Sequence, residues 1–191
     1  MPRVGPSGTL PSWDAVYDVA AAQAGYFTAA QAAAVGVSRQ LLEYHVKTKQ
    51  VLRAERGIFR LQRFPTSDRE DLVPVWLWSQ EDGVISHDTA LSIHQLSDVL
   101  PEQRHITLPV LWKRRRLRIP AGVAVHYADV PEKERTWFGP IPVTAPLRTV
   151  LDAIADGLSM DLVDQAVRQG VRRKLFTRPQ VTPALRQRGD A

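Results

Sequence analysis

The chain has 191 residues, of which 44% are hydrophobic, and this is enough apolar side chain to bury a core in one large domain or two small ones. It contains no cysteine, which excludes disulfides, thiolate zinc sites and cysteine nucleophiles, and its five histidines are too far apart in sequence to predict neighbouring metal ligands. No stretch approaches the roughly 18 apolar residues of a membrane span and the N-terminus lacks a secretory signal, so we expect a cytoplasmic globular protein without metal or other cofactor.

Basic charge is concentrated in two parts of the chain. The net charge is +5, with net +4 in residues 1–65, net −2 in residues 66–141 and net +3 in residues 142–191. Within the last segment the basic residues cluster at Arg168, Arg172, Arg173, Lys174 and Arg178. Such clusters favour an acidic partner, for example nucleic acid.

Two helices are predicted first. Apolar residues repeat at helical spacing from Ser12, the predicted N-cap, to Ala24, and Gly25 ends this helix. Thr28 then has a side chain suited to cap a short alanine-rich helix over residues 29–35. The pattern predicts two helices with a tight connection between them.

A helix-turn-helix with a wing is predicted next. A tight turn at residues 36–38 leads into a third helix over residues 39–50, with Ser38 as its N-cap. Two short strands, residues 51–54 and 58–61, follow on either side of a turn that contains glycine. In this motif the third helix enters the major groove of DNA, and basic side chains near it contact phosphates.

The predicted DNA contacts come from the third helix and the wing. One stripe of the helix is polar and consists of Arg39, Gln40, Glu43, Tyr44 and Lys47. Around the wing, the predicted phosphate contacts are Arg53, Arg56 and Arg60. Winged helices also serve as protein-docking modules, and Glu43 would repel phosphate although it can accept a hydrogen bond from a cytosine amine, so both uses stay open.

A domain boundary is predicted where the composition changes. Residues 64–68 are polar and contain proline, and beyond them the net charge becomes negative. We therefore expect a winged helix-turn-helix DNA-binding domain in residues 1–65 and a second domain in residues 66–191. The second domain is predicted to be mixed α/β with a helical C-terminal tail, which makes the whole chain α+β.

The elements predicted in the second domain alternate before the helical tail begins. They are a helix at 69–80, a strand at 84–86, a helix at 87–95, strands at 105–108 and 123–127, and helices at 160–171 and 179–188. A basic segment joins the last two strands and contains Lys113, Arg114, Arg115, Arg116 and Arg118. It fits a solvated loop, a nucleic-acid contact or a docking surface equally well.

Two short motifs in the second domain have structural explanations. Residues 86–89 predict the start of a helix, because adjacent Ser, His and Asp side chains diverge too much for a catalytic triad and nothing marks an oxyanion hole. Thr144 is the predicted cap of a helix with Pro146 in its first turn, and Arg148 and Asp152 are spaced to form an ion pair along it. No catalytic residues are predicted, and the chain is expected not to be an enzyme.

Several separated segments together resemble the AbiEi family, the antitoxins of the abortive-infection type IV group. They are RGIF at 56–59, SHDTAL at 86–91 and VTAPLRTVLD at 143–152, which occur in the family's order behind the helix-turn-helix. The resemblance covers most of residues 12–175. One departure is that Lys49 and Gln50 stand where many relatives have a glycine, which predicts a longer recognition helix in this chain.

The resemblance implies two functions. The N-terminal domain is expected to bind its own promoter, and the remainder to neutralise a nucleotidyltransferase-fold toxin encoded beside it. The active site of such a toxin is acidic, so Arg168, Arg172 and Arg173 are the predicted toxin-binding residues. The middle of the chain is an alternative docking face.

Two other function classes remain. One is a stand-alone winged-helix transcriptional regulator whose C-terminal part binds a ligand or dimerises. A toxin gene beside this gene would favour the antitoxin, and its absence would favour the stand-alone regulator. The other is an enzyme, since related N-terminal regions precede nuclease domains, but the chain lacks the required series of carboxylates with a lysine. A palindromic operator would require two copies of the protein on DNA, and the sequence leaves the oligomeric state open.

Overall fold

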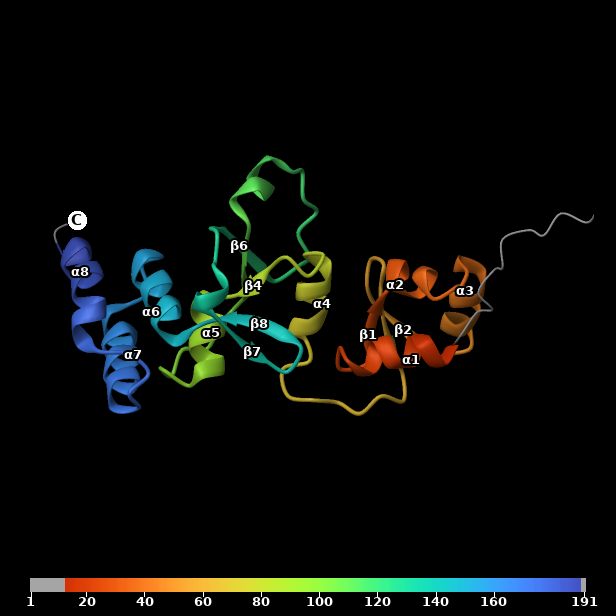
Figure 1. Cartoon of the computed structure of the whole chain (residues 1–191), viewed down its shortest axis with the longest axis horizontal. Helices are drawn as coiled ribbons and strands as arrows, with labels where there is room; N and C mark the ends of the chain where they lie inside the picture. Colours follow the sequence, from red (N-terminus) through yellow and green to blue (C-terminus); the bar gives the residue numbers. More distant parts are fainter. Residues whose placement is uncertain (1–12, 190–191) are drawn as a thin grey trace, which may run out of the picture. The chain divides into compact units, whose positions relative to one another are not determined.

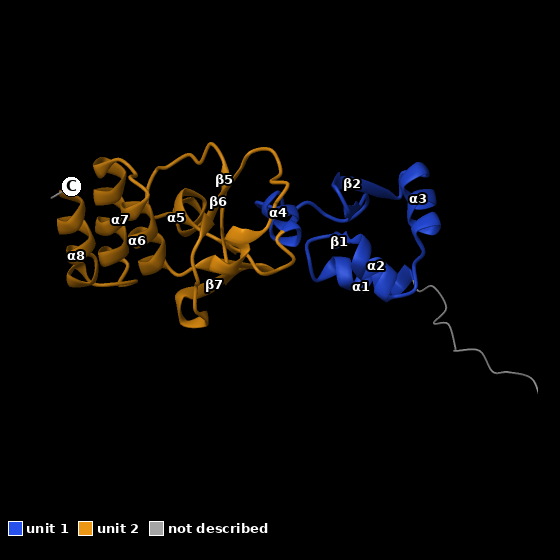
Figure 2. Cartoon of the chain, turned by 90° about the horizontal axis from the view of Figure 1, so that it is seen from above, with its two compact units in different colours: residues 1–78 blue, residues 79–191 orange. Residues whose placement is uncertain are grey.

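A computed structural model describes residues 13–189, and Ser12, the predicted first N-cap, lies outside this range. The chain divides into two compact units, residues 1–78 and residues 79–191 (Figure 2). The division follows the seventh element of the chain, helix α4 (Leu72–Trp78), whereas the sequence placed it at the polar segment before that helix. Each unit is described in turn.

The first unit is a winged helix-turn-helix (Figure 1). Its elements before α4 are α1 (Trp13–Ala21), β1 (Tyr26–Thr28), α2 (Ala29–Ala34), α3 (Arg39–Lys47), β2 (Val51–Glu55) and β3 (Ile58–Leu61). The three strands form an antiparallel sheet in the order β1-β3-β2. The predicted wing strands and the predicted recognition helix are therefore present, in an α+β fold.

The two helices of the motif begin at the predicted caps. Thr28 accepts a hydrogen bond from the Gln31 backbone N–H at 3.1 Å, and the Gln31 side chain accepts one from Thr28 N–H at 2.8 Å, which forms a capping box. Ser38 accepts a hydrogen bond from Leu41 N–H at 3.2 Å at the start of α3. These bonds satisfy backbone donors that a helix start leaves unpaired.

The predicted lengthening of the recognition helix is wrong. Helix α3 ends at Lys47 with Thr48 as its C-cap, and Lys49 takes a left-handed backbone conformation with a φ of 58°. This is the conformation that glycine favours after a helix, so Lys49 ends the helix in the same way despite its side chain.

The core of the first unit joins the three helices to the sheet. It contains Val16, Ala20, Phe27, Ala32, Val37, Leu42, Val51, Phe59 and Leu61, all buried. The Phe27 and Phe59 rings stack with centroids 5.8 Å apart, and Trp13 meets Phe27 edge-on at 6.5 Å. Since Leu42 is the buried residue of α3, this packing determines which side of the helix points outward.

The second unit is a mixed sheet with helices. Its elements are β4 (Val84–Ile85), α5 (His87–His94), β5 (Arg104–Leu108), a 3₁₀ helix (Val110–Arg114), β6 (Val123–Tyr127), a second 3₁₀ helix (Glu132–Glu134), β7 (Arg135–Phe138), β8 (Ile141–Thr144), α6 (Pro146–Ala155), α7 (Met160–Arg172) and α8 (Arg178–Gly189). The strand order is β6-β5-β4-β8-β7. Strands β5 and β6 are parallel, as are β4 and β8, while β4 with β5 and β7 with β8 are antiparallel.

The three C-terminal helices lie side by side at one end of the second unit (Figure 1). Their apolar faces share a core with α5 that contains Leu91, Leu96, Val99, Val150, Ala153, Ile154, Val163, Ala166, Val167, Phe176 and Val181. Gly170 on α7 allows this packing, because a Cβ there would lie 2.1 Å from the Phe176 ring. The predicted helical tail is thus part of the core of the second unit.

The predicted cap at Thr144 is wrong by one residue. Ala145 is the N-cap of α6 and Pro146 is its first residue, as expected from its position, but no side chain caps this helix. The Thr144 hydroxyl is instead buried 2.7 Å from the Thr149 hydroxyl.

Within residues 13–189, no helix combines the length and the apolar character needed to cross a membrane.

Candidate nucleic-acid interface

Helix α3 presents an exposed polar stripe on the side opposite its buried residue. Arg39, Gln40, Tyr44 and Lys47 are all exposed, and Tyr44 is 57% accessible. Gln40, Tyr44 and Lys47 recur at intervals of four and three, so they share one side of the helix, and Arg39 lies next to them in the first turn. The structure places them together, as the sequence predicted.

Glu43, the acidic residue of this stripe, is paired with the wing. Its Oε1 lies 2.7 Å from Nη2 of Arg53 on β2, and both side chains remain partly exposed at 40% and 47%. The Arg53 guanidinium also lies 5.1 Å from the centroid of the Phe59 ring. The pair offsets the negative charge that would repel a phosphate and connects the recognition helix to the wing.

The turn of the wing carries an exposed arginine. Arg56 precedes Gly57, whose φ of 76° is the left-handed conformation that this tight turn requires. The pairing of β2 with β3 shifts register between Arg53 and Glu55, next to this turn. Arg56 is therefore placed at the tip of the hairpin, consistent with the prediction.

Arg60 does not belong to this surface, and its prediction as a DNA contact is corrected. The residue is 9% exposed, and its Nη2 donates to Glu70 Oε2 at 3.0 Å and to the Phe64 carbonyl at 3.1 Å. Its Nη1 donates to the Leu61 carbonyl at 3.2 Å. The charge of Arg60 is used inside the first unit, where it ties β3 to the segment before α4.

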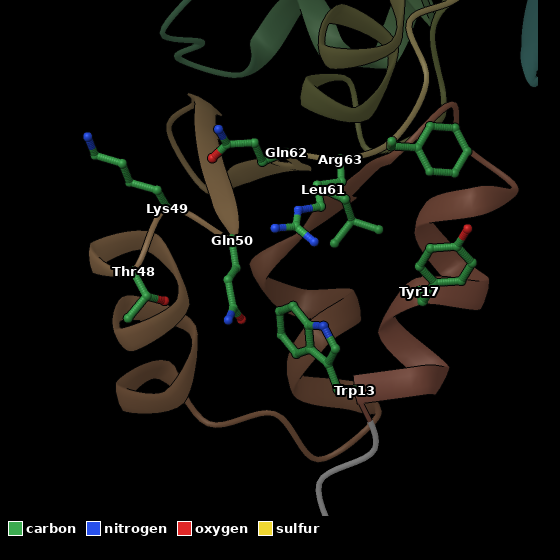
Figure 3. Close-up of a pocket in the computed structure, with 9 residues that line it drawn as sticks. Trp13, Tyr17, Thr48, Lys49, Gln50, Leu61, Gln62 and Arg63 are labelled. Atoms are coloured by element: carbon green, nitrogen blue, oxygen red, sulfur yellow. The ribbon is translucent and has the colours of Figure 1, made fainter.

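The first unit also contains a cavity that sequence reasoning missed. It has a volume of about 500 Å³ and is lined by Trp13, Tyr17, Thr48, Lys49, Gln50, Leu61, Gln62, Arg63 and Phe64 (Figure 3). Figure 3 shows Trp13, Gln50 and Arg63 pointing toward one another, with Lys49 extending away. Its lining comes from three segments far apart in sequence, and it includes none of the predicted DNA contacts.

The predicted toxin-binding arginines differ in their surroundings. Arg168 and Arg172 are exposed on α7, and Arg172 Nη2 donates to Gln169 Oε1 at 2.6 Å. Arg173 Nη1 instead donates to the His94 carbonyl at 2.6 Å and to the Gln95 carbonyl at 3.3 Å. Arg173 therefore satisfies carbonyls at the end of α5 and has a structural role beside its charge.

The predicted helix start at Ser86 is present, but its hydroxyl does not cap the helix. Ser86 is fully buried, accepts a hydrogen bond from the Thr107 hydroxyl at 2.8 Å and lies 2.9 Å from His87 Nδ1. Burial keeps this serine away from any substrate, which argues against a nucleophilic role.

The predicted ion pair between Arg148 and Asp152 is confirmed at 2.7 Å, and Arg148 also pairs with Glu134 at 2.6 Å.

Three histidines come together in the second unit, contrary to the sequence-based expectation. One nitrogen each of His87, His105 and His126 lies within 4.8 Å of the others. Burial and the neighbouring imidazoles lower the pKa of His87 to about 3, and burial also lowers the pKa of His126. The expectation failed because strand pairing, which sequence spacing does not reveal, aligns β5 with β6.

Comparison with known proteins finds a similarity in the N-terminal part of the chain. Residues 14–62 match the family model described as "Transcriptional regulator, AbiEi antitoxin", which confirms the resemblance for the winged helix-turn-helix. A crystal structure of the RV2827C protein from Mycobacterium tuberculosis shares 13% identity with a TM-score of 0.46, over 88% of this chain and 75% of that chain. No curated protein sequence matches the chain.

Proposed function

We propose that this chain is the antitoxin of a bacterial toxin–antitoxin pair, which represses its own operon by DNA binding and neutralises a nucleotidyltransferase-like toxin. The observation that carries the proposal is the exposed polar stripe of α3 with the Arg53 and Arg56 wing, inside the segment that matches antitoxin transcriptional regulators. Such a role places the protein in the cytoplasm, where its operator DNA is.

The proposed DNA complex uses the two kinds of contact that such motifs make. Arg39, Gln40 and Tyr44 lie in the first turns of α3, the part of a recognition helix that meets base edges in the major groove. Lys47 and Arg56 are exposed near the helix end and at the wing tip, where phosphate contact determines register. Arg60 is left out of this proposal because its guanidinium is buried.

Neutralisation is assigned to the second unit, and the proposed toxin contacts are Arg168 and Arg172 of α7. Both are exposed, and a nucleotidyltransferase active site is acidic because it binds metal ions and nucleotide. Arg173 contributes charge beside them while it remains bonded to α5. The alternative docking face in this unit is the exposed basic 3₁₀ helix that contains Lys113 and Arg114.

A second candidate function is a stand-alone winged-helix regulator that responds to a small ligand. The cavity of about 500 Å³ in the first unit favours it, because its lining combines aromatic rings with the polar side chains of Gln50 and Arg63. The two functions differ in their partner, so the presence of a nucleotidyltransferase-like gene beside this one supports the antitoxin.

The DNA-binding part of the proposal is tested by substituting Gln40 with alanine. We expect Gln40→Ala to relax base preference by roughly 1–3 kcal/mol at one position of the operator while it leaves non-specific binding unchanged. The measurement is a gel shift with the upstream region of the gene against single-base variants of it. The matched control is Gln62→Ala, which changes an exposed glutamine outside the stripe. Equal base selectivity in the unsubstituted protein and in both variants would contradict the proposal.

The toxin-neutralising part of the proposal is tested by charge reversal on α7. We expect Arg168→Glu with Arg172→Glu to abolish growth rescue when the protein is co-expressed with the neighbouring toxin, because acidic surfaces would then face each other. Arg173 is left unchanged, because its loss would remove the hydrogen bonds to the carbonyls at the end of α5. The matched control is Lys113→Glu with Arg114→Glu; loss of rescue in this control alone would move the docking face to the 3₁₀ helix.

A further inference from the structure

The histidine cluster of the second unit is built from three separate elements. His87 is the first residue of α5, His105 lies on β5 and His126 lies on β6, the parallel neighbour of β5. His105 Nδ1 and His126 Nε2 are 3.0 Å apart, and the His87 ring stacks on the His126 ring with centroids 3.5 Å apart. His87 is buried, while His105 and His126 are partly exposed, so one side of the cluster is open to solvent.

Neighbouring polar groups orient these rings. Ser86 Oγ lies 2.9 Å from His87 Nδ1, and Asp156 Oδ1 lies 3.8 Å from His126 Nδ1. Nδ1 of His87 is thus within hydrogen-bond distance of an oxygen, Nδ1 of His126 faces a carboxylate at a longer distance, and Nε2 of His126 faces His105. An oxygen acceptor, such as a carboxylate, on the second nitrogen is the usual arrangement behind metal-binding histidines, because it fixes the tautomer and the ring orientation.

His87 is also held in an unusual backbone conformation. Its φ is 49°, in the left-handed region that residues with a Cβ rarely adopt. It is the residue directly after the buried Ser86, whose hydroxyl bonds to Thr107 on β5. This strained start of α5 brings the His87 ring onto the ring of His126 on β6, and strain of this kind is concentrated at functional sites.

We propose that His87, His105 and His126 bind one divalent transition-metal ion of the zinc class. Three imidazole ligands without thiolate favour zinc, copper or nickel over magnesium and calcium, which prefer oxygen ligands. The open side of the cluster leaves a fourth position for water or for a small anion. This site goes beyond the proposed function, because its residues are all in the second unit and none belongs to the DNA-contacting set.

The distances require only a local rearrangement. Two imidazole nitrogens on a tetrahedral zinc ion at about 2.05 Å are roughly 3.3 Å apart. The His105 and His126 nitrogens, at 3.0 Å, therefore need to separate slightly, and the ring that donates the hydrogen bond between them carries its proton on its other nitrogen once the ion is bound. The His87 ring must turn out of its stack on His126, so that its nitrogen within 4.8 Å of the other two reaches the third position.

The test is a calorimetric titration of the full-length, tag-free and chelator-treated protein with Zn²⁺. We expect one ion per chain, and a weakening by His105→Asn or His126→Asn that exceeds the roughly 10–100-fold typical of losing an outer-shell partner. Asp156→Asn, which changes such a partner, is expected to weaken binding by about 10-fold. His45→Asn, in the first unit, is the matched control and is expected to bind like the unsubstituted protein.

Three results would overturn the site: no Zn²⁺ binding by the unsubstituted protein, undiminished binding by both cluster variants, or an equal loss in His45→Asn. Circular dichroism shows whether each variant is folded. Should either asparagine variant misfold, the visible spectrum of the Co²⁺ complex of the unsubstituted protein decides instead. Tetrahedral nitrogen ligation is expected, and a spectrum identical to that of aqueous Co²⁺ would refute the site.

Discussion

Lys49 ends the recognition helix in a conformation that its side chain disfavours. Its φ of 58° places it in the left-handed region, directly after the C-cap Thr48. A residue with a Cβ loses about 1–2 kcal/mol there, while glycine loses about 0.5–1 kcal/mol of chain entropy on folding. The position thus favours glycine by a small margin.

We therefore predict that Lys49→Gly raises the free energy of unfolding of the first unit by roughly 0.5–1 kcal/mol. Urea unfolding followed by tryptophan fluorescence measures it. Lys49→Ala removes the same charge but keeps the Cβ, so it isolates the backbone effect. Equal stabilities for the glycine and alanine variants would show that the backbone of Lys49 is not strained.

Arg60 is the residue whose predicted role the structure changes most. Sequence reasoning grouped it with Arg53 and Arg56, because all three are close in sequence to the wing turn. In an alternating strand, however, neighbouring side chains point to opposite sides, and Glu70, the ionic partner of Arg60, comes from a segment predicted to lie in another domain. A side-chain partner that lies beyond the wing in this way leaves no local signal in the sequence around Arg60.

The Arg60–Glu70 ion pair is predicted to stabilise the first unit. Arg60→Met or Glu70→Gln leaves the other charge poorly paired in a site where the side chains are only 10% and 22% exposed, and each is expected to lower the free energy of unfolding by roughly 2–3 kcal/mol. The double variant is expected to lose at least about 1 kcal/mol less than the sum of the two single losses. Additive losses in this double-mutant cycle would mean that the two residues stabilise the unit independently.

At the scale of elements, His94 joins three parts of the second unit. Its ring Nε2 lies 2.7 Å from the carbonyl of Thr144 at the end of β8, while its own carbonyl accepts from Arg173, the residue after α7. Burial lowers the pKa of His94 below its ordinary value of 6.5; the hydrogen bond with the Thr144 carbonyl acts against this shift, and the nearby Arg173 charge adds to it. The ring is therefore neutral in the folded protein near neutral pH.

The sign of the resulting pH dependence follows from linkage. Above the unfolded pKa of 6.5, both states carry a neutral His94; below it, the unfolded chain takes up the proton first, so stability falls as the pH falls. We predict that His94→Gln reduces this loss between about pH 7.5 and about pH 5.5, by at most about 1.4 kcal/mol per pH unit. Denaturant unfolding of the second unit at several pH values measures it, and an unchanged pH profile in the variant would exclude His94 as a source.

Element prediction succeeded where the signals are local. The caps Thr28 and Ser38 and the glycine turn of the wing are determined by residues within a few positions, and the structure has all of them. Strands β7 and β8 were not predicted, because short strands next to proline and glycine carry little alternation and are stabilised by pairing with each other and with β4. The histidine cluster was missed for a related reason, since only the β5–β6 pairing brings its members together.

At the scale of the whole molecule, charge is distributed over two compact units with different surfaces. The family match covers residues 14–62 and lies entirely within the first unit, so the DNA-binding part of the proposal has support that the toxin-binding part lacks. The division of the chain after Trp78, and not at residue 65, has a practical consequence. A fragment used to study the first unit alone should include α4 and Glu70, because Arg60 is bonded to that segment.

The central claim is that α3 and the wing bind the phosphate backbone of duplex DNA, and the salt dependence of binding tests it most directly. The protein is titrated with the duplex upstream of its gene at several salt concentrations. Each phosphate contact contributes about 0.9 to the slope of log K against log salt. Lys47→Ala and Arg56→Ala, which remove the two proposed phosphate contacts, are together expected to reduce this slope by roughly 2 and to weaken binding at low salt. The same charge change at Arg168 and Arg172 is expected to leave the slope unaltered; an unaltered slope and affinity in the first double variant would contradict the account.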